Sequence, residues 1–424
     1  MFYSVWRLCA KRPNTMIMGG FGFRGLCFVL VVFWLFCYGA AVEKQEQEAR
    51  SECASQIGLQ NQNGDGGDKS TADSCGCGQL SRSNVPALDT KVSENDDIIF
   101  EGKSKSKAPL YVELVDAFKK GKLREYEYAE TELLEIPGGE FTMGTDDPAI
   151  PEDGEMPARP VRISTFLLQK YEVSNRQFAQ FVLETGYKTE SEQFNWSFCF
   201  EGTLSKEVNE RITSAVEAVP WWLPVEGSDW FHPNGPDSNI LSLGYLNHPV
   251  VHVSHNDART YCEWLGLRLP TEAEFERASG GGQPEGTMFP WGNEIVPDGV
   301  YRANLWQGVF PSENTGEDGY LWSSPVDSFG PQNQYGLYNI IGNVWEWVAD
   351  AWIVRHSKSR VLVDPLFQIQ GRVDDPTVER TKKGGSYMCH KSYCYRYRVV
   401  SRSHNSADSA AQNLGIRCAT SIDD

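Results

Sequence analysis

Tryptophan is concentrated in one part of this 424-residue chain. Eleven of the thirteen tryptophans fall between Trp196 and Trp352, where many glycines and prolines interrupt the sequence. Large aromatic side chains gain stability by burial, whereas glycine and proline end helices and strands. The combination predicts a compact, loop-rich domain with an aromatic core. The composition changes near Leu133, and no linker-like break follows, so we expect one domain over residues 133–420.

Regular elements are few in this predicted domain. Three N-terminal helix caps are expected, and two of them have the spacing of a capping box. The caps are Ser174 (with Gln177), Ser254 and Thr271 (with Glu274). Short alternating runs at 161–163 and 250–253 predict strands. The fold class is therefore α+β, a single irregular domain with little regular secondary structure.

The N-terminus has the composition of a secretory signal. Four basic residues precede an apolar run at 26–37, and small residues follow at 39–41. The run is shorter than the ~20 residues that a membrane-spanning helix needs. We expect a cleaved signal peptide over residues 1–41, with an uncleaved signal anchor as the alternative. No other stretch is long and apolar enough to span a membrane, so we expect no membrane attachment after cleavage.

The next segment, residues 42–107, is expected to be a disordered extension. No Phe, Trp or Tyr occurs between Val42 and Ile99, and polar residues dominate. Such a segment cannot bury enough apolar surface to offset the entropy of ordering. Within it, Cys75 and Cys77 suit thiol exchange or covalent capture of a partner, for example a lumenal thiol oxidoreductase. An incidental, processed tail is the alternative.

The net charge of −18 argues against a nucleic-acid partner, whose phosphates this chain would repel. Secretion would place the cysteines outside the signal region in an oxidising compartment, where disulfides persist. These are Cys53, Cys75, Cys77, Cys199, Cys262, Cys389, Cys394 and Cys418. A glycosylation sequon, Asn195-Trp196-Ser197, would then be usable.

The run from Gly384 to Arg398 concentrates reactive side chains. Cys389 and Cys394 are separated by four residues, with Ser386 and His390 close by in sequence. Two such cysteines can form a disulfide if the loop folds back, or they can hold a soft metal ion as thiolates. A structural zinc would need four ligands, and no clear fourth ligand is near. Both remaining interpretations point to redox or metal chemistry.

This run closely resembles the active-site segment of the formylglycine-generating enzymes. Further landmarks of that family extend the resemblance over roughly Leu133 to Thr420. They are Ile136–Gly144, Glu172–Asn175, Arg268–Glu274, Tyr335–Asn339, Gly342–Trp347 and Asn413–Cys418. Most of these landmarks also occur in inert members of the superfamily. The pair Cys389 and Cys394, which the inactive secretory paralog lacks, indicates the catalytic member.

The resemblance implies a fold related to C-type lectins and a specific activity. Family members oxidise the cysteine of a Cys-x-Pro-x-Arg motif in newly made sulfatases to Cα-formylglycine. By that resemblance, Cys389 and Cys394 hold Cu(I), molecular oxygen is the oxidant, and hydrogen leaves the β-carbon of the substrate cysteine. Ser386 would orient oxygen or water, and His390 would donate a proton or hold a neighbouring group of the site in place. The implied location is the lumen of the endoplasmic reticulum, with partial secretion.

The resemblance also implies two structural calcium sites and one disulfide. The first site would use the side chains of Asn304 and Asp318, with the carbonyls of Leu305 and Tyr320. The second would use the side chains of Asn339 and Glu346, with the carbonyls of Gly342 and Val344. The implied bridge joins Cys262 to Cys418. Cys199 has no family counterpart, and it is either free and buried or paired with Cys53.

Two other functions compete with the oxidase interpretation. One is a non-catalytic paralog that binds sulfatases, and the other is a calcium-dependent, lectin-like module. The thiol pair favours the oxidase. A lectin would more typically present a calcium-bound Glu/Asn set open to sugar, and the sequence contains no obvious set of that kind.

Overall fold

The computed structural model describes Arg82 and residues 131–216, 218–369, 372, 375 and 377–422. All of these belong to one compact unit. The predicted signal peptide, Cys53, Cys75 and Cys77 lie outside the described residues, as does all of the predicted extension 42–107 except Arg82. Within the described ranges, no helix combines the length and apolar character that crossing a membrane requires.

Three helices pack into the domain, and each begins at a predicted cap. They are α4 (Asn175–Thr185), α7 (His255–Trp264) and α8 (Glu272–Gly280). Capping boxes at Ser174, Ser254 and Thr271 confirm the sequence prediction. Two shorter helices are α5 (Glu190–Phe194) and α6 (Lys206–Asn209). Single 3-10 turns occur at Pro151–Asp153, Glu201–Thr203, Tyr245–Asn247 and Pro297–Gly299.

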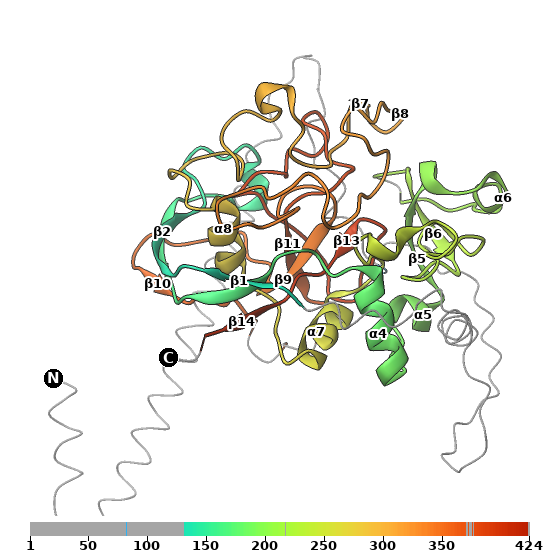
Figure 1. Ribbon diagram of the computed structural model, residues 1–424, viewed down its shortest axis with the longest axis horizontal. Helices are drawn as coiled ribbons and strands as arrows, with labels where there is room; N and C mark the ends of the chain where they lie inside the picture. Colours follow the sequence, from blue (N-terminus) through green and yellow to red (C-terminus); the bar gives the residue numbers. More distant parts are fainter. Residues whose placement is uncertain are drawn as a thin grey trace, which may run out of the picture. The chain divides into compact units, whose positions relative to one another are not determined.

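The strands form several small sheets (Figure 1). The largest has the order β12-β11-β9-β13, with bounds Ser403–Ser406, Glu379–Lys383, Trp345–Ala351 and Leu414–Gly415. Two three-stranded sheets are β1-β4-β14 (Leu133–Ile136, Phe166–Gln169, Ala419–Ser421) and β10-β3-β2 (Leu362–Val363, Arg159–Ile163, Gly139–Met143). Two pairs remain, β5-β6 (Trp196–Phe200, Trp222–Glu226) and β7-β8 (Gly308–Val309, Glu313–Asn314). The predicted strand at 161–163 lies in β3.

The predicted strand at 250–253 is wrong. The alternation of apolar residues there is real, but His252 has a φ of 58°, which breaks the extended backbone. The segment instead makes single hydrogen bonds in two directions. The N–H of Val250 donates to the carbonyl of Val173 (2.8 Å), and the N–H of His252 donates to the carbonyl of Ala411 (3.0 Å).

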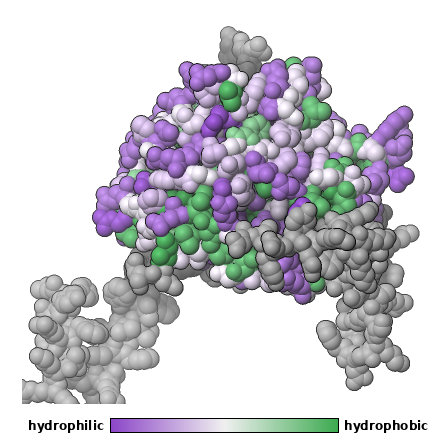
Figure 2. Space-filling model, viewed as in Figure 1, coloured by the Kyte–Doolittle hydropathy of each residue, from purple (hydrophilic) through white to green (hydrophobic). Residues whose placement is uncertain are grey.

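The core is aromatic, as the tryptophan distribution predicts. Trp222, Trp230, Trp345 and Trp347 are fully buried. Figure 1 shows β9 and β11 in the middle of the domain, with α8 beside them. The face seen in Figure 2 is mainly hydrophilic, with smaller hydrophobic areas between. The large aromatic side chains therefore form the core on which many short elements pack. Strand β11 leads directly into the segment that carries the thiols.

Candidate active site

The thiol segment begins where β11 ends, at two glycines with left-handed backbone conformations. Gly384 has a φ of 94° and Gly385 a φ of 75°, a region that favours glycine. A Cβ atom at Gly385 would lie 2.9 Å from the Cβ of Tyr397, closer than such atoms approach. The two glycines therefore allow the start of the segment to pass against its own end.

Backbone hydrogen bonds fold the segment so that the two cysteines meet. The N–H of Cys389 donates to the carbonyl of Ser386 (2.8 Å), and the N–H of Cys394 donates to the carbonyl of His390 (2.7 Å). The Cα atoms of the cysteines lie 4.7 Å apart, and both side chains are fully buried. In this structure the two sulfurs form a disulfide, one of the alternatives that the sequence left open.

The same geometry fits the metal-binding alternative. Reduction of the disulfide would leave two adjacent sulfurs, and thiolates are the soft donors that select Cu(I). A zinc site is less consistent with the described residues, because they contain no group of three or more His, Cys, Asp or Glu side chains placed to share an ion. The donor set at Cys389 and Cys394 therefore suits a two-coordinate soft ion.

Ser386 and His390 occupy different positions relative to the thiols. Ser386 is fully buried, and its hydroxyl accepts a hydrogen bond from the Asn413 side chain (2.9 Å). Its carbonyl also accepts the bond that positions Cys389. His390 is half-buried, and its Nδ1 lies 2.7 Å from the hydroxyl of Ser392. His390 lines a pocket together with Cys389, whereas Ser386 is not among the lining residues.

This pocket has a volume of about 360 Å³ and opens beside Cys389. It is lined by Ile295, Val296, Tyr301, Ala303, Leu305, Trp306, Gln307, Gly308, Glu317, Cys389, His390, Lys391 and Tyr397. A larger pocket of about 510 Å³ lies between α7 and α8 and includes no residue of the thiol segment. The chemistry of the lining therefore identifies the candidate active site, and the size of the pocket does not.

An aromatic cluster adjoins the thiol segment through Tyr393. The rings of Phe310 and Tyr393 stack with their centroids 3.9 Å apart and their planes within 7°. Trp221 meets both rings edge to face, each at 5.2 Å. The sequence did not point to Trp221 or Phe310 as neighbours of the thiol segment. Their positions in distant loops gave no signal in the sequence.

Tyr387 and the arginines after the thiols are packed inside the domain, and Tyr397, which also lines the pocket, packs on Phe289. Tyr387 is fully buried, and Tyr397 stacks parallel to Phe289 with centroids 6.1 Å apart. The arginines that follow the thiols form buried ion pairs. These pairs are Arg396 with Asp153, Arg398 with Glu155 and Arg402 with Glu272.

The first predicted calcium site has oxygen donors that suit the ion. Asn304 Oδ1 is buried and has no hydrogen-bond partner. Asp318 Oδ2 accepts hydrogen bonds from the N–H of Leu305 (3.0 Å) and the amide of Gln307 (2.9 Å). The Gln307 amide also donates to the carbonyl of Leu305. Burial raises the pKa of Asp318, a cost that a bound cation would offset.

The second predicted site contains an additional carboxylate, Glu172. Asn339 and Asn343 donate to its two oxygens, at 2.9 and 3.0 Å, while Asn339 Oδ1 is buried without a partner. Glu346 is bonded to Arg417 through both of its oxygens, each at 2.8 Å. Burial, and then the charge of Glu346, raise the pKa of Glu172 well above its ordinary value. Two buried carboxylates facing one arginine suit a divalent cation.

The remaining predicted positions are a disulfide, a sequon and an unassigned thiol. Cys262 in α7 is bridged to Cys418, the pairing that the resemblance implied. Asn195 is exposed, and its side chain donates to Glu226 (3.1 Å). Cys199 is a free, buried thiol 3.0 Å from the hydroxyl of Ser228, and burial raises its pKa to about 12.

Comparison with known proteins agrees with the site. A family model described as "Sulfatase-modifying factor enzyme 1-like domain" matches residues 119–422, most of the chain. The chain belongs to the formylglycine-generating enzyme family. The formylglycine-generating enzyme of Mus musculus is 57% identical over 69% of this chain and 75% of its own length. That of Thermomonospora curvata is 50% identical over 68% of this chain and 92% of its own length.

Other comparisons show the fold and the diversity within this family. The structure of PvdO from Pseudomonas aeruginosa covers 70% of this chain and 97% of its own, with a TM-score of 0.50. At 21% identity it supports the fold alone. The formylglycine-generating enzyme family also includes a Bos taurus protein named inactive, which is 44% identical over 68% of this chain and 87% of its own length. Family membership therefore does not by itself decide activity.

Proposed function

We propose that this protein oxidises a cysteine of newly made sulfatases to Cα-formylglycine and thereby activates them. The observation that carries the proposal is the meeting of Cys389 and Cys394 beside a pocket on the surface of the domain. Membership of the formylglycine-generating enzyme family supports the same reaction. The client would be an unfolded polypeptide with a Cys-x-Pro-x-Arg motif.

The proposed reaction uses copper and molecular oxygen. A Cu(I) ion held by Cys389 and Cys394 would supply a binding site for the client thiolate and a route for electrons to oxygen. The atoms balance as follows: oxygen accepts two hydrogens from the client cysteine and two from an external thiol reductant, and leaves as water. One water then hydrolyses the client thioaldehyde to the aldehyde and hydrogen sulfide.

The chain's own residues hold and orient the reacting groups in this proposal. Ser386 fixes the turn through its carbonyl bond to the Cys389 N–H, and Asn413 in turn holds the Ser386 hydroxyl. His390 lies at the pocket and could move a proton to or from the client. The stacked rings of Phe310 and Tyr393 offer a flat apolar surface for the client chain.

We further propose two structural calcium ions and a lumenal location. The unpartnered oxygens of Asn304 and Asn339 support the calcium sites. The secretory signal predicted over residues 1–41 supports entry into the endoplasmic reticulum, where nascent sulfatases and thiol oxidoreductases would be the partners. Glycosylation of Asn195 belongs to the same proposal.

The test is conversion of a synthetic peptide. Full-length protein, copper, oxygen and excess thiol reductant are incubated with a Cys-x-Pro-x-Arg peptide, and mass spectrometry measures the aldehyde. We expect wild-type protein to form aldehyde and both Cys389→Ser and Cys394→Ser to lose at least 99% of the rate. Cys199→Ser is the matched control and should retain it. Peptide binding without aldehyde would favour the non-catalytic, sulfatase-binding alternative.

A further inference from the structure

Arg82, in the segment predicted to be disordered, is held against the domain by four contacts. Its Nε donates to the carbonyl of Asp408 (3.0 Å), and its Nη1 donates to the carbonyl of Trp196 (3.1 Å). The guanidinium carbon also lies 4.2 Å from the ring centre of Phe194 and 4.4 Å from that of Trp196. Two aromatic faces and two carbonyls are the surroundings that recognise a guanidinium.

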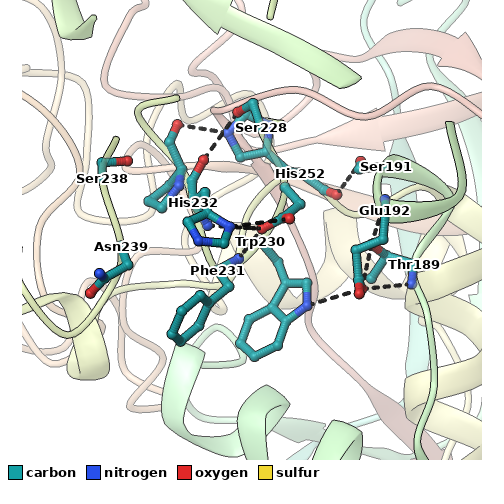
Figure 3. Close-up of polar contacts among 12 residues, drawn as sticks. Thr189, Ser191, Glu192, Ser228, Trp230, Phe231, His232, Ser238, Asn239 and His252 are labelled. Carbon is teal, nitrogen blue, oxygen red and sulfur yellow. Dashed lines mark hydrogen bonds and ion pairs between the residues drawn. The ribbon is translucent and has the colours of Figure 1, made fainter. Parts of the chain in front are cut away.

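Hydrogen bonds inside the domain fix the position of the surface that receives Arg82. Phe194 ends α5, whose first turn is closed by the capping box of Thr189 and Glu192. Figure 3 shows the Trp230 indole reaching the same Glu192 carboxylate, at 3.3 Å. It also shows the Ser191 hydroxyl bonded to the carbonyl of His252, at 2.8 Å. These bonds give the receiving surface a fixed shape that does not depend on Arg82.

Nearby carboxylates partly offset the cost of burying the charge of Arg82. Asp408, Glu190 and Asp257 are near enough to stabilise the charged form of Arg82. Burial acts in the opposite direction and lowers the pKa of Arg82 to about 10, so the guanidinium remains charged at neutral pH.

Strand β5 connects this surface to the candidate active site. Trp196 and Phe200 are its first and last residues, about 13 Å apart at the rise of an extended strand. The ring of Phe200 packs on that of Trp306 with centroids 5.8 Å apart, and the N–H of Trp306 donates to the carbonyl of Cys389. The arginine of an extended Cys-x-Pro-x-Arg motif lies about 13 Å from its cysteine, a reach of the same order as the length of β5.

We propose that Arg82 is an internal ligand of a guanidinium site, formed by Phe194, Trp196 and Asp408, that also receives the arginine of the client motif. The N-terminal segment then competes with the client and restrains the enzyme until a client displaces it. This inference rests on the proposed function for the identity of the client, but the site itself can be tested without turnover.

The fit of Arg82 is incomplete, which makes the contact displaceable. Its Nη2 is buried and has no hydrogen-bond partner. An enclosed donor without an acceptor weakens an interaction, so the Arg82 contact is open to competition by another arginine. The competition raises the apparent KM of the client by the inverse of the fraction of open sites.

The first test compares kinetics of Arg82→Ala and wild type. If the segment fills the site about nine-tenths of the time, Arg82→Ala should lower the KM of a Cys-x-Pro-x-Arg peptide about tenfold and leave kcat unchanged. With the client arginine replaced by leucine, the same variant should change KM less than twofold. Arg211→Ala removes an exposed arginine and is the control. An unchanged KM, or an equal change with both peptides, would overturn the proposal.

The second test measures binding alone. A fluorescent peptide of residues 78–86 is added to full-length protein, and its anisotropy is recorded. We expect Arg82→Ala protein to bind it at least fivefold more tightly than wild type, and to bind the peptide's own Arg82→Ala version no better than wild type does. Equal binding of both peptides would overturn the proposal. Because no turnover is needed, a protein that fails to form aldehyde could still pass this test.

Discussion

The charge states of two buried carboxylates, Glu172 and Glu346, affect the stability of the loop that carries Asn339. Glu172 and Glu346 are both withdrawn from water, and within this cluster Arg417 is bonded to Glu346 alone. Burial disfavours the charged form of Glu172, and the charge of Glu346 disfavours it further. A divalent cation at this point would remove both penalties, so calcium and protons should compete for the same residue.

The first prediction concerns replacement of Glu172 by glutamine, which removes the charge and keeps the shape. In chelator at pH 7, Glu172→Gln should be more stable than wild type, by about 1.4 kcal/mol for each unit by which folding raises the pKa of Glu172, up to the limit set by pH 7. In saturating calcium the order should reverse, since the variant has lost a ligand. Differential scanning fluorimetry with and without calcium checks both halves, and Glu184→Gln, on an exposed helix face, is the control.

The second prediction is the pH dependence of the calcium-free protein. A carboxyl group whose pKa is raised by folding binds its proton more tightly in the native state. Its contribution to stability is complete below its unfolded pKa of about 4.3 and is lost as the pH rises through the native value. Calcium-free wild type should therefore lose more unfolding free energy between pH 5 and 7 than Glu172→Gln does, as measured by urea titration. Parallel curves would contradict the assignment.

At the scale of elements, short helices depend on their caps because they are too brief to be stable alone. Helix α8 runs from Glu272 to Gly280 and packs against β9 and β11. Its N-terminus is closed by Thr271, whose hydroxyl accepts the N–H of Glu274 at 3.1 Å. The cap therefore stabilises the helix that packs on β11, and β11 leads into the thiol segment.

The third prediction tests this cap. Thr271→Ala should lower the unfolding free energy by about 1 kcal/mol, because the amides of the first turn lose their acceptor. Thr271→Ser should recover most of the loss. Urea unfolding followed by tryptophan fluorescence measures both, with Ser357→Ala as an exposed control. Equal stability of the alanine and serine variants would show that the cap contributes nothing.

At the scale of the whole molecule, cross-links replace long regular elements. The bridge between Cys262 and Cys418 has a sequence separation of 156 and ties α7 to the residue before β14. The proposed calcium ions would join further loops. In a domain of small sheets, such links restrict the unfolded chain or stabilise the native state where hydrogen-bonded elements are too short to do so.

The fourth prediction is that Cys262→Ser with Cys418→Ser destabilises the domain without abolishing chemistry. A loop of this length gives an expected loss of about 3–5 kcal/mol of unfolding free energy. Aldehyde formation measured well below the melting temperature should persist, because the bridge does not touch the pocket at Cys389. Loss of turnover in a variant that is still folded at the assay temperature would contradict this separation.

The fifth prediction concerns calcium as a whole-domain stabiliser. Exhaustive chelation should lower Tm more than it lowers aldehyde formation at low temperature, because an ion that binds only the native state adds stability in proportion to its affinity. Restored calcium should return the original Tm, and magnesium should return less of it. An identical melting curve after chelation would show that neither calcium site stabilises the domain.

Local features of the sequence predicted their own structures well. The caps at Ser174, Ser254 and Thr271 begin helices as expected, because a cap needs only a few neighbouring residues. The alternation at 250–253 failed because it is a weaker signal. The N–H of His252 is instead bonded to the carbonyl of Ala411, a residue 159 positions away.

The sequence by itself determined the α+β class, the aromatic core and the presence of two thiols in one turn, since each depends on composition or on spacing within a few residues. Tertiary structure alone decided what surrounds them. Trp221 and Phe310 meet Tyr393, Glu172 meets Asn339, and Arg82 meets Trp196, all across long separations in the chain. These contacts form because short elements pack around a common core, and they cannot be predicted from spacing along the chain.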